Sequence, residues 1–246
     1  VDTPDECRPT IPEVDRIIRE GAAMVPVLAD TRYIRAFAGV RPLIGSSGGD
    51  DRKLSRGFAL LDHAAEGLEN FTTIAGGKLT TYRRMAEKTA DLVCKKLRIS
   101  EPCRTRTEPL LPSDTGRWTQ PGLAPREWLR SGRSDDFLLC ECEMVSRDVV
   151  DRIIQSLRNQ GGQPTLLSVG LRSRIGKGPC QGGFCSARIA AYMYDTGAVT
   201  GDSGLTGLRD FLRERWRGKR PVLWDFAMEQ AELQEALHCG LFGLEQ

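Results

Sequence analysis

Two close pairs of cysteines constrain the fold and the chemistry of this chain more than any other feature of its sequence. The pairs are Cys140-x-Cys142 and, after 37 intervening residues, Cys180-x4-Cys185. The remaining four of the eight cysteines stand singly, and we expect no function for them. Paired cysteines in an intracellular chain usually bind a metal or carry out redox chemistry. We therefore expect the two pairs to form one site.

Composition excludes several classes of protein. The chain of 246 residues is 40% hydrophobic and has a formal net charge of +2. Such a charge gives no strong attraction for nucleic acid, so a general nucleic-acid-binding protein is disfavoured. No stretch approaches the ~20 consecutive apolar residues of a transmembrane helix, and the first residues lack the regions of a secretory signal. We expect a soluble, intracellular protein of one or two domains.

The spacing of the cysteines favours an iron–sulfur cluster over a zinc site. Zinc ribbons and fingers place about two to four residues between paired ligands, whereas Cys140 and Cys142 have one residue between them. The Cys-x-x-Cys motif of thioredoxin-like redox chemistry is absent. A [2Fe–2S] cluster needs four thiolates, which two pairs can supply. The alternatives are a zinc site and a set of buried structural thiols without metal.

The loop that holds the second pair is rich in glycine and follows several basic residues. Glycine lets the backbone approach a ligand and turn its N–H groups towards an anion. Cys185 stands at the start of an expected helix, where free amides favour negative charge. We expect the basic residues to offset the charge of four thiolates. The glycines are Gly176, Gly178, Gly182 and Gly183, and the basic residues are Arg172, Arg174 and Lys177.

Hydrophobic periodicity predicts both helices and strands. Thr10 and Pro12 mark the start of one helix, and Ser146 is a possible N-cap of another. Residues 98–135 contain several prolines and little periodicity, which predicts a linker. The expected strands are 31–40, 57–61 and 71–75, and the expected later helices are 80–97, 146–157, 165–172, 186–194, 205–216 and 224–237.

A glycine turn between an expected strand and an expected helix is a second candidate site. The segment reads TIAGGKLTTY from Thr73, and such a turn presents backbone N–H groups to an electron-rich group, beside the cation of Lys78. A simple Gly-Gly turn explains the same residues equally well. The segment lacks the spacing of a Walker loop, and Gln181 stands where a Rossmann fingerprint around Gly176 and Gly178 would need glycine.

Residues 136–198 resemble the BFD-like [2Fe–2S] domain, a small all-α module. The segments LLCECEMVSRDVV and RSRIGKGPCQGGFCSARI carry this resemblance. It implies that Cys140, Cys142, Cys180 and Cys185 hold a [2Fe–2S] cluster. The stand-alone ferredoxin of this family has fewer residues between the second pair, whereas domains fused to flavoprotein dehydrogenases look like the present spacing. The departure therefore points to an enzyme appendage.

The segments RAFAGVRPLI and SRGFALLDHAAEGLENFTTIAGGKLTTYRRMAEK resemble the C-terminal part of the FAD-dependent glycerol-3-phosphate dehydrogenases. With the tail FLRERWRGKRPVLWDFAMEQAEL, the whole chain resembles the catalytic subunits of the anaerobic members of this family. The resemblance implies an α+β chain. Its parts are an incomplete FAD-dependent oxidoreductase domain (1–97), a proline-rich linker (98–135), the BFD-like domain (136–198) and a helical tail (199–246).

The same resemblance implies roles for single residues. A phosphate dianion is held well by guanidinium groups, and a cation near the flavin stabilises its reduced form. By the resemblance, Arg41 and Arg56 clamp the substrate phosphate with Lys78 nearby, and Gly76, Gly77, Lys78, Leu79 and Thr80 line the flavin and ribityl side of FAD.

The implied activity is the oxidation of glycerol 3-phosphate to dihydroxyacetone phosphate. Electrons would pass from FAD through the [2Fe–2S] cluster to partner subunits and the quinone pool, in the cytoplasm at the inner membrane. The Gly-x-Gly-x-x-Gly loop that binds the ADP half of FAD is not found, so we expect a C-terminal fragment that is inactive by itself. The alternative is a zinc- or iron–sulfur-binding regulatory or docking module without catalysis.

Overall fold

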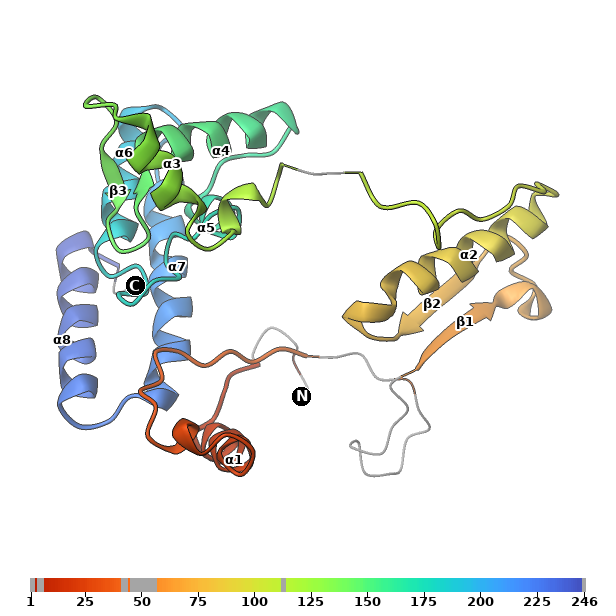
Figure 1. The fold of residues 1–246 in the computed structure, drawn as a ribbon, viewed down its shortest axis with the longest axis horizontal. Helices are drawn as coiled ribbons and strands as arrows, with labels where there is room; N and C mark the ends of the chain where they lie inside the picture. The colour runs from red at the N-terminus through yellow and green to blue at the C-terminus, as the bar shows by residue number, and fades with distance from the viewer. Residues whose placement is uncertain (1–2, 4–6, 41–43, 45–56, 112–113, 245–246) are drawn as a thin grey trace. The chain divides into compact units, whose positions relative to one another are not determined.

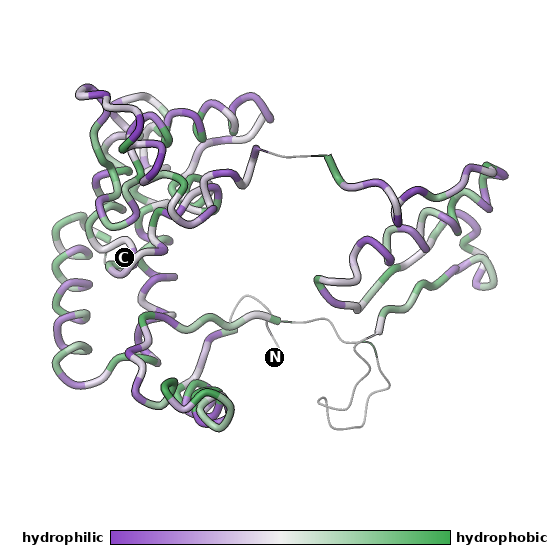
Figure 2. The backbone as a smooth tube through the Cα atoms, in the orientation of Figure 1, coloured by the Kyte–Doolittle hydropathy of each residue, from purple (hydrophilic) through white to green (hydrophobic). Residues whose placement is uncertain are grey.

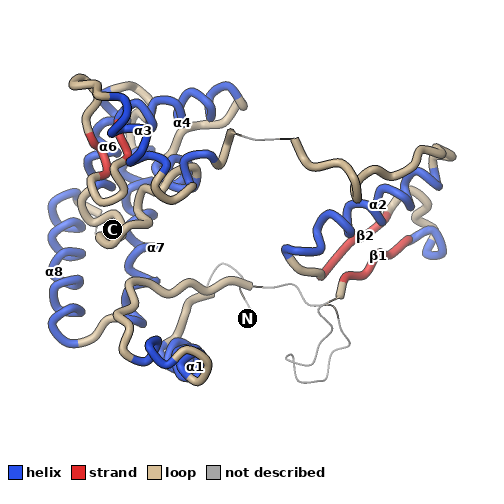
Figure 3. The backbone as a smooth tube through the Cα atoms, in the orientation of Figure 1, coloured by secondary structure: helices blue, strands red, loops and turns tan. Residues whose placement is uncertain are grey.

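The chain forms two compact units. The computed structural model describes residues 3, 7–40, 44, 57–111 and 114–244 (Figure 1). One unit, here called the hairpin unit, comprises 1–5 and 39–112, and the other, here called the helical unit, comprises 6–38 and 113–246. Helices dominate, and the described strands form two short two-stranded sheets (Figure 3), which fits the expected α+β class.

The hairpin unit is an antiparallel β-hairpin beside one long helix. Strand β1 (Phe58–Asp62) pairs with β2 (Thr72–Gly76), and Phe58 lies opposite Gly76. Helix α2 (Tyr82–Lys96) follows the short 3-10 helix η5 (Leu79–Thr81), and η4 (His63–Glu66) lies between the strands. None of the described residues of this unit is buried. The unit therefore has no hydrophobic core of its own among them.

The helical unit contains the hydrophobic core, and helix α7 contacts α5, α6 and α8 within it. Its second two-stranded sheet pairs β3 with β4. The helices of this unit are α1 (Ile11–Ala22), η2 (Pro26–Ala29), η6 (Arg117–Thr119), α3 (Leu123–Ser131), α4 (Arg147–Asn159), α5 (Leu166–Leu171), α6 (Cys185–Asp195), α7 (Ser203–Lys219), η7 (Arg220–Val222) and α8 (Asp225–Phe242), and its strands are β3 (Leu138–Cys140) and β4 (Val145–Ser146).

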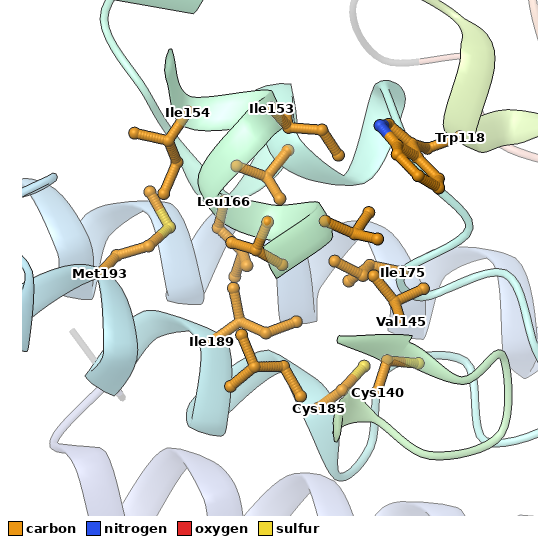
Figure 4. Close-up of a cluster of buried hydrophobic side chains, with 14 of the residues drawn as sticks. Trp118, Cys140, Val145, Ile153, Ile154, Leu166, Ile175, Cys185, Ile189 and Met193 are labelled. Carbon is orange, nitrogen blue, oxygen red and sulfur yellow. The ribbon is translucent and has the colours of Figure 1, made fainter. Parts of the chain in front are cut away.

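Helix α4 shows how the sequence pattern builds this core. Its buried residues recur three and four positions apart, as on one face of a helix, and run from Val149 to Leu157. They join Leu166, Ile189 and Met193 in a single cluster (Figure 4). Cys140 and Cys185 lie at the edge of this cluster. The core therefore fixes the elements that carry two of the paired cysteines.

Helix starts follow the expected signals, with one difference. Thr10 precedes α1, with Pro12 in the first turn, and the Glu13 carboxylate accepts a 3.1 Å hydrogen bond from the Thr10 N–H. Ser146 precedes α4, but its side chain makes no capping bond. The carboxylate of Asp136 instead accepts from the N–H of Asp148 at 3.0 Å. A distant residue thus caps α4.

The strand expected over 31–40 is wrong. These residues form neither helix nor strand. The Ala36 N–H donates to the Gly218 carbonyl on α7 at 2.8 Å, and a Cβ at Gly218 would lie 2.6 Å from the Arg35 Nε. The alternating pattern therefore reflects a segment that lies against a helix, where a ladder of strand hydrogen bonds does not form.

The second half of the segment expected as a linker, 98–135, is helical, although its sequence shows little periodicity. Residues 117–131 form η6 and α3, and Trp118 and Ala124 are buried in the core. Pro125 lies in the first turn of α3, where proline does not interrupt a helical hydrogen bond. Proline here marks the start of a helix.

The other expected elements are confirmed with small shifts of their ends, and the β3–β4 hairpin was missed because its strands are too short to show a pattern. The two compact units also divide the chain differently from the expected domains, since residues 6–38 pack with 113–246. The expected domain boundaries stay a prediction.

Hydrophobic and hydrophilic residues alternate along the helices of both units (Figure 2). Within the described ranges, no helix is long and apolar enough to cross a membrane.

The core makes a prediction about stability. Ile189 is fully buried, with 0% of its surface exposed. We expect Ile189→Ala to lower the free energy of unfolding of the helical unit by about 2–5 kcal/mol, because it removes apolar contacts and leaves a cavity. Urea unfolding followed by circular dichroism measures this. The control is Leu237→Ala, at a residue that is 61% exposed, and an equal loss in both variants would contradict the core described here.

Candidate functional site

The structure brings the four paired cysteines together. Cys140 ends β3, Cys142 lies in the turn before β4, Cys180 lies in the loop after α5, and Cys185 begins α6. The Cys142 Sγ lies 3.8 Å from the Cys140 Sγ and 3.7 Å from the Cys180 Sγ. Cys140 is hydrogen-bonded to Cys185. The four sulfur atoms thus form a continuous row, and their role as metal ligands stays a prediction.

The row has a buried end and an open end. Cys140 and Cys185 are 0% and 3% exposed, and they lie beside Val145 and Ile189 in the core (Figure 4). Cys142 is exposed and Cys180 is partly exposed. A group bound by all four sulfurs would therefore be shielded on one side and accessible on the other.

Glycine is required where the second cysteine loop passes the first. A Cβ at Gly178 would lie 2.5 Å from the Cys142 Sγ, closer than real atoms approach. Gly176 and Gly182 have φ of +75° and +86°, and a Cβ at either would clash with the ring of Phe211. Positive φ and close approach both favour glycine. The expected role of these glycines near the sulfur atoms agrees with this geometry.

Backbone N–H groups point at the two buried sulfur atoms. The Glu143 N–H donates to Cys140, and the Gly176 N–H donates to Cys185. Cys185 is also the first residue of α6, as expected, where the helix terminus favours an anion. Hydrogen bonds of this kind stabilise thiolates and tune bound clusters.

The pKa values of the thiols diverge. The hydrogen bond from Cys140 and the Gly176 N–H lower the pKa of Cys185. The hydrogen bond that Cys140 donates to Cys185, together with burial, raises the pKa of Cys140 well above its usual range. Burial and the neighbouring Cys140 raise the pKa of Cys142 to about 12. Metal uptake at neutral pH would thus displace protons from Cys140 and Cys142.

Of the three basic residues expected to offset the thiolates, Arg174 is paired with a carboxylate, and the other two donate to neutral acceptors. Arg174 forms a bidentate ion pair with Glu143, at 2.6 and 3.2 Å. Lys177 Nζ donates to the Ser173 carbonyl at 2.6 Å, and Arg172 donates to Gln160 Oε1 at 3.4 Å. The charge of Arg174 is therefore largely balanced by Glu143.

A cation that sequence reasoning missed lies behind the second pair of cysteines. Arg215 of α7 is 1% exposed and interacts electrostatically with Cys180 and Cys185. The sequence holds a signal for it, since Arg215 follows the buried Leu208 and Leu212 at helical spacing. An arginine on the apolar face of an amphipathic helix is buried unless the helix is displaced.

The donor set fits an iron–sulfur cluster. Ser186 Oγ and Arg215 Nε are buried and have no hydrogen-bond partner among the described residues, so both can donate to a sulfur-containing group. Across the described residues, no group of three or more His, Cys, Asp or Glu side chains is placed so that it could hold a metal ion. Two pairs of thiols can supply the four ligands of a two-iron cluster, and this assignment stays a prediction.

The glycine turn of the hairpin unit has the expected form. Gly76 and Gly77 have φ of +78° and +82°, and the Gly77 N–H donates to the Gly57 carbonyl at 2.7 Å. A Cβ at Gly76 would lie 2.7 Å from that carbonyl oxygen, and one at Gly77 would clash with Met85. The turn therefore needs both glycines for its backbone alone.

The residues after this turn face solvent. Lys78 and Thr80 are exposed, and Leu79 is 89% exposed. The Lys78 N–H donates to Thr81 Oγ1 at 2.9 Å, and its ammonium group forms no ion pair with a described residue. Arg41 and Arg56, the expected phosphate ligands, lie outside the described residues. The roles expected for this loop stay predictions.

Gly178 provides a test of the cysteine geometry. We expect Gly178→Ala to lower the iron bound per chain after anaerobic reconstitution several-fold, because the new Cβ displaces the Cys142 thiol. Iron analysis measures this. Gly207→Ala on α7 is the control, since a Cβ there meets its nearest neighbour at 4.0 Å. Normal iron content in Gly178→Ala would contradict the expectation that this close approach limits metal binding.

The chain is similar in sequence to proteins named as one subunit, designated A, of anaerobic glycerol-3-phosphate dehydrogenase. It is 38% identical over 264 residues to one of Escherichia coli K12, which covers 98% of this chain and 48% of that protein. It is 39% identical over 263 residues to one of Haemophilus influenzae, with 98% and 46% covered. A Haloferax volcanii protein, designated A1, is 36% identical over 260 residues, with 95% and 42% covered.

The chain spans about half the length of the curated relatives it matches. No family model and no solved structure matches it.

Proposed function

Because the chain belongs to this family of anaerobic glycerol-3-phosphate dehydrogenase subunits, we propose that it carries the electron-transfer centre of such an enzyme. That enzyme oxidises glycerol 3-phosphate to dihydroxyacetone phosphate. Its electrons pass from FAD through a [2Fe–2S] cluster at Cys140, Cys142, Cys180 and Cys185. They then reach partner subunits and the quinone pool at the inner membrane.

The observation that carries this proposal is the row of four thiols. The turn between β3 and β4 supplies two of them, and the loop between α5 and α6 supplies the others. Neither loop could hold a cluster alone, because each contributes only two ligands. When bound, the cluster supplies a site that accepts and releases one electron at a time.

The chain's own residues control access to that site. Cys140 and Cys185 anchor it to the core, and the N–H groups of Glu143 and Gly176 stabilise their thiolates. The exposed Cys142 marks the side where an electron-transfer partner can approach. Electron exit at this side needs no movement of the core.

The glycine turn is proposed as one wall of the flavin site. FAD supplies the hydride acceptor when bound. Gly76 and Gly77 allow close approach of the backbone, and the exposed Lys78 offers a cation for the reduced flavin or the substrate phosphate. Arg41 and Arg56 are proposed to complete the phosphate site.

Metal analysis tests the cluster directly. We expect about two irons and two sulfides per chain in anaerobically prepared protein, as a [2Fe–2S] cluster requires, and an EPR signal after reduction with dithionite. Cys142→Ser should lose both. Cys103→Ser is the control, because Cys103 is exposed and lies outside the row. One zinc without sulfide would favour the regulatory or docking module instead.

The flavin proposal makes a separate prediction. The 246-residue chain should bind added FAD weakly and show no dehydrogenase activity. Tightly held ligands of this size lose roughly 70–90% of their surface to the protein, whereas the described hairpin unit buries none of its own residues. Titration of flavin fluorescence measures the affinity. Retention of about one equivalent of FAD through gel filtration would contradict this prediction.

A further inference from the structure

Arg215 is a buried cation for which the electron path described above assigns no task. We propose that Arg215, held by Glu235, sets the reduction potential of the [2Fe–2S] cluster and raises it. The inference rests on the proposed cluster. It assigns to the C-terminal tail a role in electron transfer, since Arg215 lies on α7 and Glu235 on α8.

Among the described residues, those that accept hydrogen bonds from the Arg215 side chain lie on helix α8. Its Nη1 donates to Glu235 Oε2 at 3.1 Å, and its Nη2 donates to Gln234 Oε1 at 2.8 Å. Its Nε is buried and has no partner in the described part of the chain. The guanidinium therefore has one donor that neither Glu235 nor Gln234 engages.

The second loop of cysteines is tied to the same two helices. A Cβ at Gly183 would lie 2.8 Å from Gln234 Nε2, so the loop packs against the residue that holds Arg215. Phe211, one turn before Arg215 on α7, lies against Gly176 and Gly182. Arg215 is thus held in place by residues that also shape the loop carrying Cys180 and Cys185.

One carboxylate and several basic side chains lie near Arg215. Glu235 is its ion-pair partner, and Lys219, Arg35 and His238 also interact with it electrostatically. Arginine stays protonated when buried. Lys219 adds a positive charge beside the Arg215–Glu235 pair, and Arg35 is itself paired with Glu214 at 3.4 Å, whereas Arg174 at the first cysteine pair is matched by Glu143.

The direction of the effect follows from charge. A cluster with four thiolates is anionic and gains one more negative charge on reduction. A fixed cation stabilises the reduced form more than the oxidised form, and low polarity strengthens this difference. Arg215 should raise the potential, and Glu235 should moderate that rise.

Variants of both partners separate these effects. Glu235→Gln removes the negative charge but keeps an oxygen that can accept from Arg215, so it should raise the potential. Arg215→Met combined with Glu235→Gln removes the pair without leaving a buried charge unpaired, so it should lower the potential relative to Glu235→Gln. Glu229→Gln is the control, because it makes the same charge change at an exposed position of α8.

The experiment is an EPR-monitored redox titration of the reconstituted chain, with iron and sulfide measured on every sample. We expect the ratio of reduced to oxidised cluster at fixed potential to change at least tenfold between Glu235→Gln and the double variant. That corresponds to about 59 mV for one electron. The control should match the unmodified chain.

Each other outcome is decisive. If Glu235→Gln and the double variant hold full iron and sulfide and their clusters have equal reduction potentials, the role of Arg215 is overturned. The proposed cluster is then still supported. Loss of the cluster in Glu235→Gln would make the pair a structural element and would also overturn it. An unmodified chain without iron and sulfide would overturn the proposed cluster, and with it this inference.

Discussion

Four sulfur atoms gathered into one row are the constraint on which the rest of the helical unit depends. Two loops must meet without a side chain between them, which is why the backbone at Gly178 passes directly beside the Cys142 thiol. The same crowding brings thiols of unequal acidity into contact, because Cys140 donates to Cys185 and leaves Cys185 as the more acidic partner. Packing at Cys142 and protonation at Cys140 and Cys185 therefore both follow from the meeting of the two cysteine loops.

The tail is part of this arrangement. Phe211 fills the space that Gly176 and Gly182 leave open, so α7 supports the cysteine loop from behind. The N-terminal segment joins from another side, where Arg35 donates to the Glu214 carbonyl at 3.0 Å and to Gln181 Oε1 at 3.5 Å. Segments far apart in the sequence thus converge on one loop, and the loop's conformation depends on all of them.

Most helices and the pairing of the cysteines could be predicted from the sequence, because they depend on residues that are near one another along the chain. The periodicity of α4, the signals at Thr10 and Pro12, and the cysteine spacing each describe neighbours along the chain. The strand expected over 31–40 failed because its alternation comes from lying against α7, a distant partner. Helix α3 was not expected because its short run of residues lies among the prolines of 98–135, although Pro125 fits in its first turn.

Charge was the least predictable property of the site. Arg172, Arg174 and Lys177 are close to the cysteines in sequence, yet Glu143 and backbone carbonyls satisfy two of them. Arg215 is distant in sequence, but the spacing of Leu208 and Leu212 buries it with the core. Burial removes water from around a charge, so its effect on a neighbouring anion grows. The buried cation beside the second pair of cysteines is therefore found from the pattern of a distant helix, whereas the contacts that hold it, to Glu235 and Gln234, appear only in the tertiary structure.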